Sequence, residues 1–68
     1  MKRQIIKFTM HPYEAAALER MNFNLEIGEE FVELDPPSEL MPPEAGYVFG
    51  FAAGHHVWVP ESHLSPRS

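Results

Sequence analysis

The expected fold of this chain is built around residues 46–59, Gly46-Tyr-Val-Phe-Gly-Phe-Ala-Ala-Gly-His-His-Val-Trp-Val59. Aromatic and β-branched residues, which favour strands, are concentrated in residues 46–51 and 55–59. The Ala-Ala-Gly sequence between them is able to reverse the chain, so the stretch predicts a β-hairpin. Pro60 removes a backbone donor and ends the second strand, and residues 60–64 then suit a single tight helical turn.

Two shorter stretches before the hairpin also predict strands. Residues 23–27 alternate apolar and polar side chains, which is the pattern of a half-buried strand, and Gly28 ends it. Residues 31–34 resume the strand pattern. Residues 35–43 contain two diprolines and predict an exposed loop, because proline disrupts regular pairing.

The first 21 residues predict one strand and one helix. Residues 3–9 are rich in β-branched and aromatic side chains and favour a first strand. Residues 13–21 are rich in helix formers, and Pro12 stands where a first helical turn tolerates proline, so a short helix is expected near residues 12–20. The expected fold class is therefore mainly β, with four to five strands and this short helix.

The length and composition predict one small domain. A chain of 68 residues fits a single domain, expected over residues 1–65, followed by a polar tail at 66–68. The chain has no cysteine, which excludes disulfides and thiolate zinc sites and favours a reducing cytoplasm. No stretch reaches the roughly 20 apolar residues of a membrane span, so no membrane association is expected.

Two stretches of this chain resemble signatures of the Src-homology-3 (SH3) family. Residues 54–64, Gly-His-His-Val-Trp-Val-Pro-Glu-Ser-His-Leu, resemble the closing signature of that family. Residues 25–31, Leu-Glu-Ile-Gly-Glu-Glu-Phe, resemble its turn into the second strand. The resemblance implies a small SH3-like barrel of four to five strands.

The same resemblance implies a peptide groove. Pro60 matches the groove proline of the family, Tyr13 matches an opening tyrosine, and Tyr47 falls where the groove tryptophan usually lies. His63 replaces the usual closing tyrosine. As one alternative, the resemblance therefore implies a reader of proline-rich peptides whose groove is formed by Tyr13, Tyr47, Trp58 and Pro60.

The charge distribution points to a different surface. The net charge is −5, and no lysine or arginine occurs between Met21 and Pro66. A phosphate backbone would be repelled by this part of the chain, so direct nucleic-acid binding is not expected. A basic protein surface is a better partner, because complementary charge favours encounter. The expected contacts are the acidic side chains and two aromatic residues: Glu26, Glu29, Glu30, Glu33, Asp35, Glu39, Glu44, Tyr47 and Trp58.

The leading functional hypothesis is a non-enzymatic adaptor or inhibitor that presents this acidic surface to a basic protein. In its most specific form the partner processes nucleic acid, as for small phage-encoded inhibitors of host defence. The alternatives are the SH3-like reader of proline-rich peptides and an accessory subunit in which Met10, Met21 and Met41 would be covered by neighbours. For Trp58, core packing is the competing interpretation.

Catalytic and metal-binding functions are not expected. The four histidines at 11, 55, 56 and 63 lack metal-ligand spacing, because adjacent residues on a strand point to opposite faces. Ser62 and His63 form the only nominal nucleophile–base pair, and neighbours in sequence seldom have the required geometry. The sequence therefore predicts neither an enzyme nor a cofactor.

Overall fold

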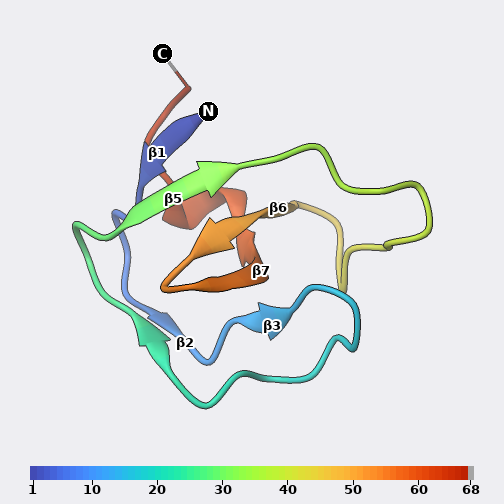
Figure 1. The fold of residues 1–68 in the computed structure, drawn as a ribbon. Helices are drawn as coiled ribbons and strands as arrows, with labels where there is room; N and C mark the ends of the chain where they lie inside the picture. The colour runs from blue at the N-terminus through green and yellow to red at the C-terminus, as the bar shows by residue number, and fades with distance from the viewer. Residues whose placement is uncertain (68) are drawn as a thin grey trace.

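The computed structural model describes residues 1–67 as a mainly β domain, which confirms the expected class (Figure 1). Its elements are β1 Lys2–Gln4, β2 Thr9–Met10, β3 Tyr13–Glu14, β4 Asn24–Leu25, β5 Glu30–Glu33, β6 Tyr47–Ala52, β7 His55–Pro60 and the 3-10 helix η1 Glu61–His63. No helix in the described range is long and apolar enough to cross a membrane. The expected polar tail ends at Ser68, which lies outside the described residues.

The β6–β7 hairpin is the longest pairing in the fold, as the sequence predicts. All six residues of β6 pair with residues of β7, with Phe49 opposite Trp58. The turn consists of Ala53 and Gly54, both with positive φ (52° and 81°), and this backbone twist matches that of the flanking strands. Pro60 leads directly into η1, so the predicted tight helical turn is also confirmed.

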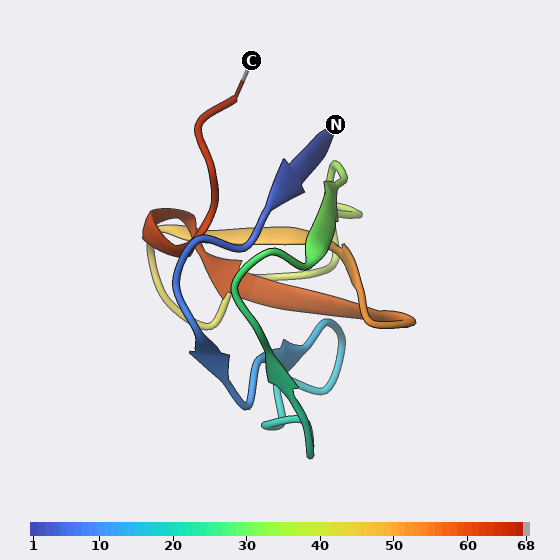
Figure 2. The ribbon, with the colours of Figure 1, turned by 90° about the vertical axis from the view of Figure 1, so that its left-hand side faces the viewer.

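The remaining strands surround this hairpin. The five-stranded sheet has the order β1-β5-β6-β7-β3, and β2 pairs separately with β4. Figure 2 shows the orange hairpin between β1 and β5 on one side and β2, β3 and β4 on the other. After η1 the chain returns to β1, where Leu64 bridges Ile5 and the Ser65 N–H donates to the Gln4 carbonyl. The beginning and the end of the chain therefore lie side by side.

The helix predicted near residues 12–20 is wrong. Tyr13 pairs with Trp58 as part of β3, and the Glu14 carboxylate accepts the backbone N–H groups of Ala16 and Ala17 in a turn. Leu18 has φ 57°, a left-handed conformation that no α-helix contains. An isolated helix of two turns is unstable in water because nucleation is costly, so pairing with β7 prevails over local helix propensity.

The single strand predicted over residues 3–9 is also wrong, since the chain bends at Lys7. Its first part pairs with β5 and its last part with β4, so the segment changes partners midway. The strand predicted over residues 23–27 is shortened to Asn24–Leu25 because the chain turns at Gly28, where φ is 98°. Period-two patterning does not reveal where a strand changes neighbours.

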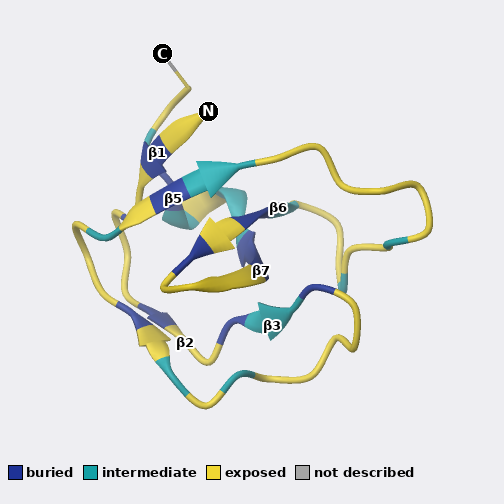
Figure 3. Cartoon of the chain, in the orientation of Figure 1, coloured by how far each residue is buried: buried dark blue, intermediate teal, exposed yellow. Residues whose placement is uncertain are grey.

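The core consists of two groups of buried side chains. The larger group joins strands from both ends of the chain and comprises Ile5, Leu25, Phe31, Ala52, Val57, Val59 and Leu64. The smaller group comprises Ala15, Phe49 and Trp58, with Tyr13, Leu40 and Tyr47 packed against it. Figure 3 shows buried positions on β1, β5, β6 and β7, and mostly exposed positions through the loop of residues 34–46. The smaller group lies against the groove that is described below as the candidate functional site.

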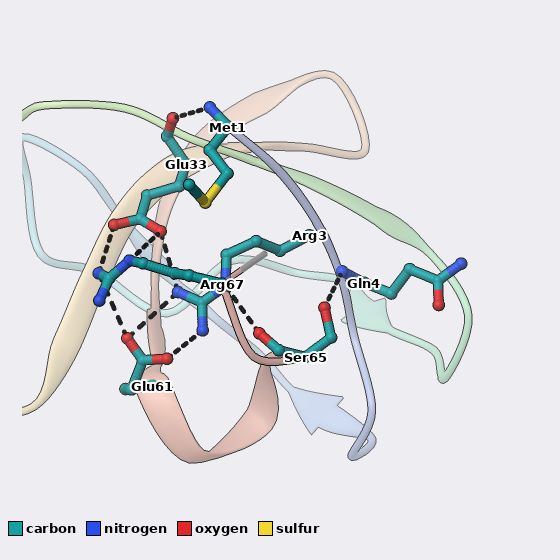
Figure 4. Close-up of polar contacts among 7 residues, drawn as sticks. All are labelled: Met1, Arg3, Gln4, Glu33, Glu61, Ser65 and Arg67. Atoms are coloured by element: carbon teal, nitrogen blue, oxygen red, sulfur yellow. Dashed lines mark hydrogen bonds and ion pairs between the residues drawn. The ribbon is translucent and has the colours of Figure 1, made fainter.

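A buried arginine joins the two ends of the chain to the sheet (Figure 4). The Arg3 side chain is 1% exposed; its Nη1 donates to Glu33 Oε1 at 2.9 Å and its Nε donates to the Ser65 carbonyl at 2.8 Å. Its Nη2 pairs with Glu61, and Arg67 Nη2 pairs with Glu33 Oε2 at 2.6 Å. These contacts fix β1, β5, η1 and residues 65–67 relative to one another.

Candidate functional site

One groove brings together all four residues expected to form a peptide site. Its volume is about 210 Å³, and Tyr13, Tyr47, Trp58 and Pro60 all contribute to its walls. The complete lining is Thr9, Met10, Pro12, Tyr13, Arg20, Tyr47, Trp58, Pro60 and His63. These residues come from β2, β3, β6, β7 and η1, and from the segments around Pro12 and Arg20.

Strand register explains why the aromatic residues meet. Tyr13 on β3 stands opposite Trp58 on β7, and Tyr47 on β6 stands opposite Pro60, which is also on β7. Residues 58 and 60 lie two apart on β7, so their side chains share one face of the sheet. The rings of Tyr13 and Tyr47 lie edge to face with centroids 5.8 Å apart. This arrangement gives the groove two half-buried tyrosines beside a proline ring.

Trp58 is a core residue that also lines the groove. Trp58 is only 2% exposed, and its Nε1–H donates to the Ala15 carbonyl at 3.0 Å. The indole packs against Phe49 with centroids 5.5 Å apart. Trp58 therefore supports the groove from below and offers little surface to a partner.

The polar side of the groove includes two residues that the sequence did not identify. The Arg20 guanidinium lies 4.1 Å from the centre of the Tyr13 ring, and its Nη1 donates to the His11 carbonyl at 3.1 Å. Thr9 Oγ1 is 2.8 Å from His63 Nδ1. Arg20 was missed because residues 12–20 were expected to be helical, which would not place Arg20 beside Tyr13. In the structure Tyr13 and Arg20 form an isolated antiparallel β-bridge, which a helix over these residues does not allow.

Stability is expected to depend on the protonation of His63. Burial, with a smaller contribution from the charge of Lys7, lowers the pKa of His63 below its ordinary value of 6.5. Folding therefore favours the neutral imidazole: its contribution is complete above about pH 6.5 and is lost as the pH falls from there through the folded-state pKa. We expect the urea midpoint to fall between about pH 7 and 5, above the range in which carboxylates protonate.

The variant His63→Asn is the matched control for this titration, since its amide is able to donate to or accept from Thr9 Oγ1 but does not ionise. Its urea midpoint should change less than that of the wild type over the same pH range. Equal pH dependence in the two proteins would show that His63 does not determine this loss of stability.

The acidic side chains expected to bind a partner do not form one surface. Glu26 and Glu29 lie before β5 and Glu30 begins it, whereas Asp35, Glu39 and Glu44 lie in the loop after it. Figure 1 shows these two segments at opposite ends of β5. Six of the seven carboxylates therefore fall into two separate groups, and Glu33 lies on β5 between them.

Several of these carboxylates already have partners within the domain. Glu33 pairs with Arg67 and Arg3, and these pairs lower the pKa of Glu33, with Arg67 the larger cause. Glu29 Oε2 accepts the Glu26 N–H at 2.7 Å, and Glu30 lies 3.7 Å from Lys2 Nζ. Glu33 is therefore least available to an outside partner, while the exposed loop residues are most available.

Two of the four histidines, His55 and His56, pack against aromatic rings. His55 stacks on Phe23 at 5.2 Å, whereas its neighbour His56 stacks on Phe49 at 5.8 Å. Within residues 1–67, no three histidine, aspartate or glutamate side chains gather in a way that would hold a metal ion.

Comparison with known proteins adds no assignment: no family model matches the chain, and neither the curated proteins nor the solved structures give a match. Function therefore has to be inferred from the geometry of the groove.

Proposed function

We propose that this chain is a non-enzymatic protein-interaction domain with an SH3-like barrel, and that it binds a proline-containing segment of another protein in the groove. The observation that supports this most strongly is the convergence of Tyr13, Tyr47, Trp58 and Pro60, from three different strands, on one groove. The return of residues 64 and 65 to β1 is compatible with a barrel.

The chemistry of the groove suits an extended proline segment. Such a segment adopts the polyproline II conformation without internal hydrogen bonds, and its rings pack well between aromatic side chains. The edge-to-face tyrosines and the ring of Pro60 provide this kind of surface. At about 210 Å³ the groove lies below the roughly 300–1,000 Å³ of small-molecule sites, which favours a few side chains of a peptide over a whole substrate.

We expect Tyr47→Ala to weaken binding of fluorescein-labelled decaproline by about tenfold or more, because interface tyrosines that fill a central position often contribute at least 2 kcal/mol. Binding is measured by fluorescence anisotropy. Phe51→Ala is the matched control, since Phe51 lies on the same strand, is exposed and does not line the groove. Equal affinities of wild type and Tyr47→Ala, or no saturable binding by the wild type, would contradict the proposed site.

The acidic loop of residues 34–46 favours a second candidate function, the adaptor or inhibitor of a basic protein, which in the most specific form of this hypothesis processes nucleic acid. Asp35, Glu39 and Glu44 are exposed on this loop, and Leu40 packs against the smaller core group of Ala15, Phe49 and Trp58. Negative charge is thus presented from a loop stiffened by two diprolines. Partner capture from a lysate, eluted with a salt gradient, distinguishes the two functions: an acidic inhibitor releases its partner at moderate salt, whereas a reader of proline segments captures proline-rich proteins.

A further inference from the structure

Arg20 is the one fixed charge on the groove. Of the nine residues that line it, none is an aspartate or glutamate, and only Arg20 is a lysine or arginine. Within residues 1–67 Arg20 takes part in none of the ion pairs, which use Lys2, Arg3 and Arg67 as cations. In a protein of net charge −5, the fixed charge on the lining of the groove is therefore positive.

The guanidinium is held in place while most of its hydrogen-bonding capacity stays free. It lies over the Tyr13 ring at 4.1 Å, and one hydrogen bond from Nη1 to the His11 carbonyl fixes its orientation. A guanidinium has five N–H donors, and no other hydrogen bond from the Arg20 side chain occurs within the described residues. Oε1 of Glu14 accepts the N–H groups of Ala16 and Ala17, and within the described residues Glu14 forms no ion pair with Arg20.

We propose that the groove selects a segment in which an acidic side chain accompanies proline, and that Arg20 binds this carboxylate. This inference rests on the proposed function, since it specifies the ligand of the same groove. A planar guanidinium forms paired, charge-assisted hydrogen bonds with a carboxylate, and these are stronger than bonds between neutral groups. A lysine or arginine at the same position of the ligand would be repelled.

The overall negative charge does not remove this preference. Charges more than about 8 Å apart are largely screened at 0.15 M ionic strength, whereas a direct contact with Arg20 is screened much less. Packing on Tyr13 also limits the access of water to one face of the guanidinium. The contact at Arg20 is therefore expected to outweigh repulsion from the carboxylates, none of which lines the groove.

Three unlabelled peptides, each measured by its competition with fluorescein-labelled decaproline, test the inference. Each is an acetylated and amidated decapeptide of nine prolines with Glu, Gln or Lys at the sixth position, so no terminal carboxylate competes. At 0.15 M salt we expect the wild type to bind the Glu peptide about tenfold more tightly than the Gln peptide, a factor typical of a hydrogen bond to a charged group, and the Lys peptide most weakly.

Arg20→Gln should bind the Glu and Gln peptides equally, with its affinity for the Gln peptide close to that of the wild type. Lys2→Gln is the matched control, because it changes the charge by the same amount at an exposed site that does not line the groove. It should keep the preference for Glu. If Arg20→Gln fails to fold, the order of the three peptides with the wild type still decides.

The outcomes separate the inference from the proposed function. If the three peptides bind equally to the wild type while Tyr47→Ala abolishes binding, the role of Arg20 is overturned and the groove function stands. If the Lys peptide binds best, selection is opposite to that proposed. If no peptide binds the wild type, the inference fails together with the proposed function.

Discussion

Gly50→Ala is expected to prevent the domain from folding. A Cβ at this position of β6 would lie 2.5 Å from the Val32 carbonyl oxygen and 2.6 Å from Cε1 of Phe31. The carbonyl belongs to the neighbouring strand and Phe31 is fully buried in the larger core group, so neither is able to move without disrupting the sheet. A domain of this size has a free energy of unfolding of only about 3–10 kcal/mol. The overlap at Gly50→Ala is expected to cost most of this free energy.

Circular dichroism and urea unfolding measure this effect, with Gly28→Ala as the control. Gly28 has open space around its missing side chain but a φ of 98°, so alanine there meets backbone strain alone, of order 1–3 kcal/mol. We expect Gly28→Ala to fold with reduced stability and Gly50→Ala to lack a cooperative transition. A normally folded Gly50→Ala protein would show that β5 and β6 are not as close as described.

Arg3→Met is expected to cost about 3 kcal/mol or more of the free energy of unfolding. The side chain of Arg3 is buried and holds Glu33, Glu61 and the Ser65 carbonyl, so methionine removes a paired charge and leaves acceptors unsatisfied. Glu61 is partly exposed, which lets water replace some of the lost contacts and places the expected loss at the lower end of the usual range.

Arg67→Gln provides the comparison for Arg3→Met, because Arg67 contacts the same two glutamates from an exposed position. Its effect on the urea midpoint should be clearly smaller, since solvent screens exposed pairs. The pairs also lower the pKa of both glutamates, chiefly through Arg67 for Glu33 and through Arg3 for Glu61. Their stabilisation is present above about pH 4.5 and is lost as the pH falls through the folded-state values, and this loss should shrink in Arg3→Met. Equal midpoints for the two variants would mean that burial of Arg3 adds nothing.

Local signals in the sequence were sufficient for the second half of the fold. The β6–β7 hairpin and η1 follow from strand formers, a turn able to adopt positive φ, and a proline, all within 20 residues. The first half depends on partners that are far away in the chain. Tyr13 lies in a segment of helix formers, and it becomes a strand residue because Trp58 stands opposite it.

The candidate site was predictable only in part, for the same reason. The resemblance of residues 54–64 to a known closing signature was enough to nominate Pro60 and, with it, Tyr13 and Tyr47, which the structure places on one groove. Arg20 could not be placed there while its segment was expected to be helical. The charge distribution likewise predicted that Glu33 contacts a partner protein, because the sequence does not reveal its ion pairs with Arg3 and Arg67.

Locating the bound proline segment on the protein decides whether the groove is a peptide site. We would titrate ¹⁵N-labelled protein with unlabelled decaproline and follow the backbone amide resonances. We expect saturable shifts that are largest around Tyr13, Tyr47 and His63, which line the groove, and small at residues 26–30, which lead into β5. Shifts that are absent, or that are largest at residues 26–30, would contradict a peptide site in this groove.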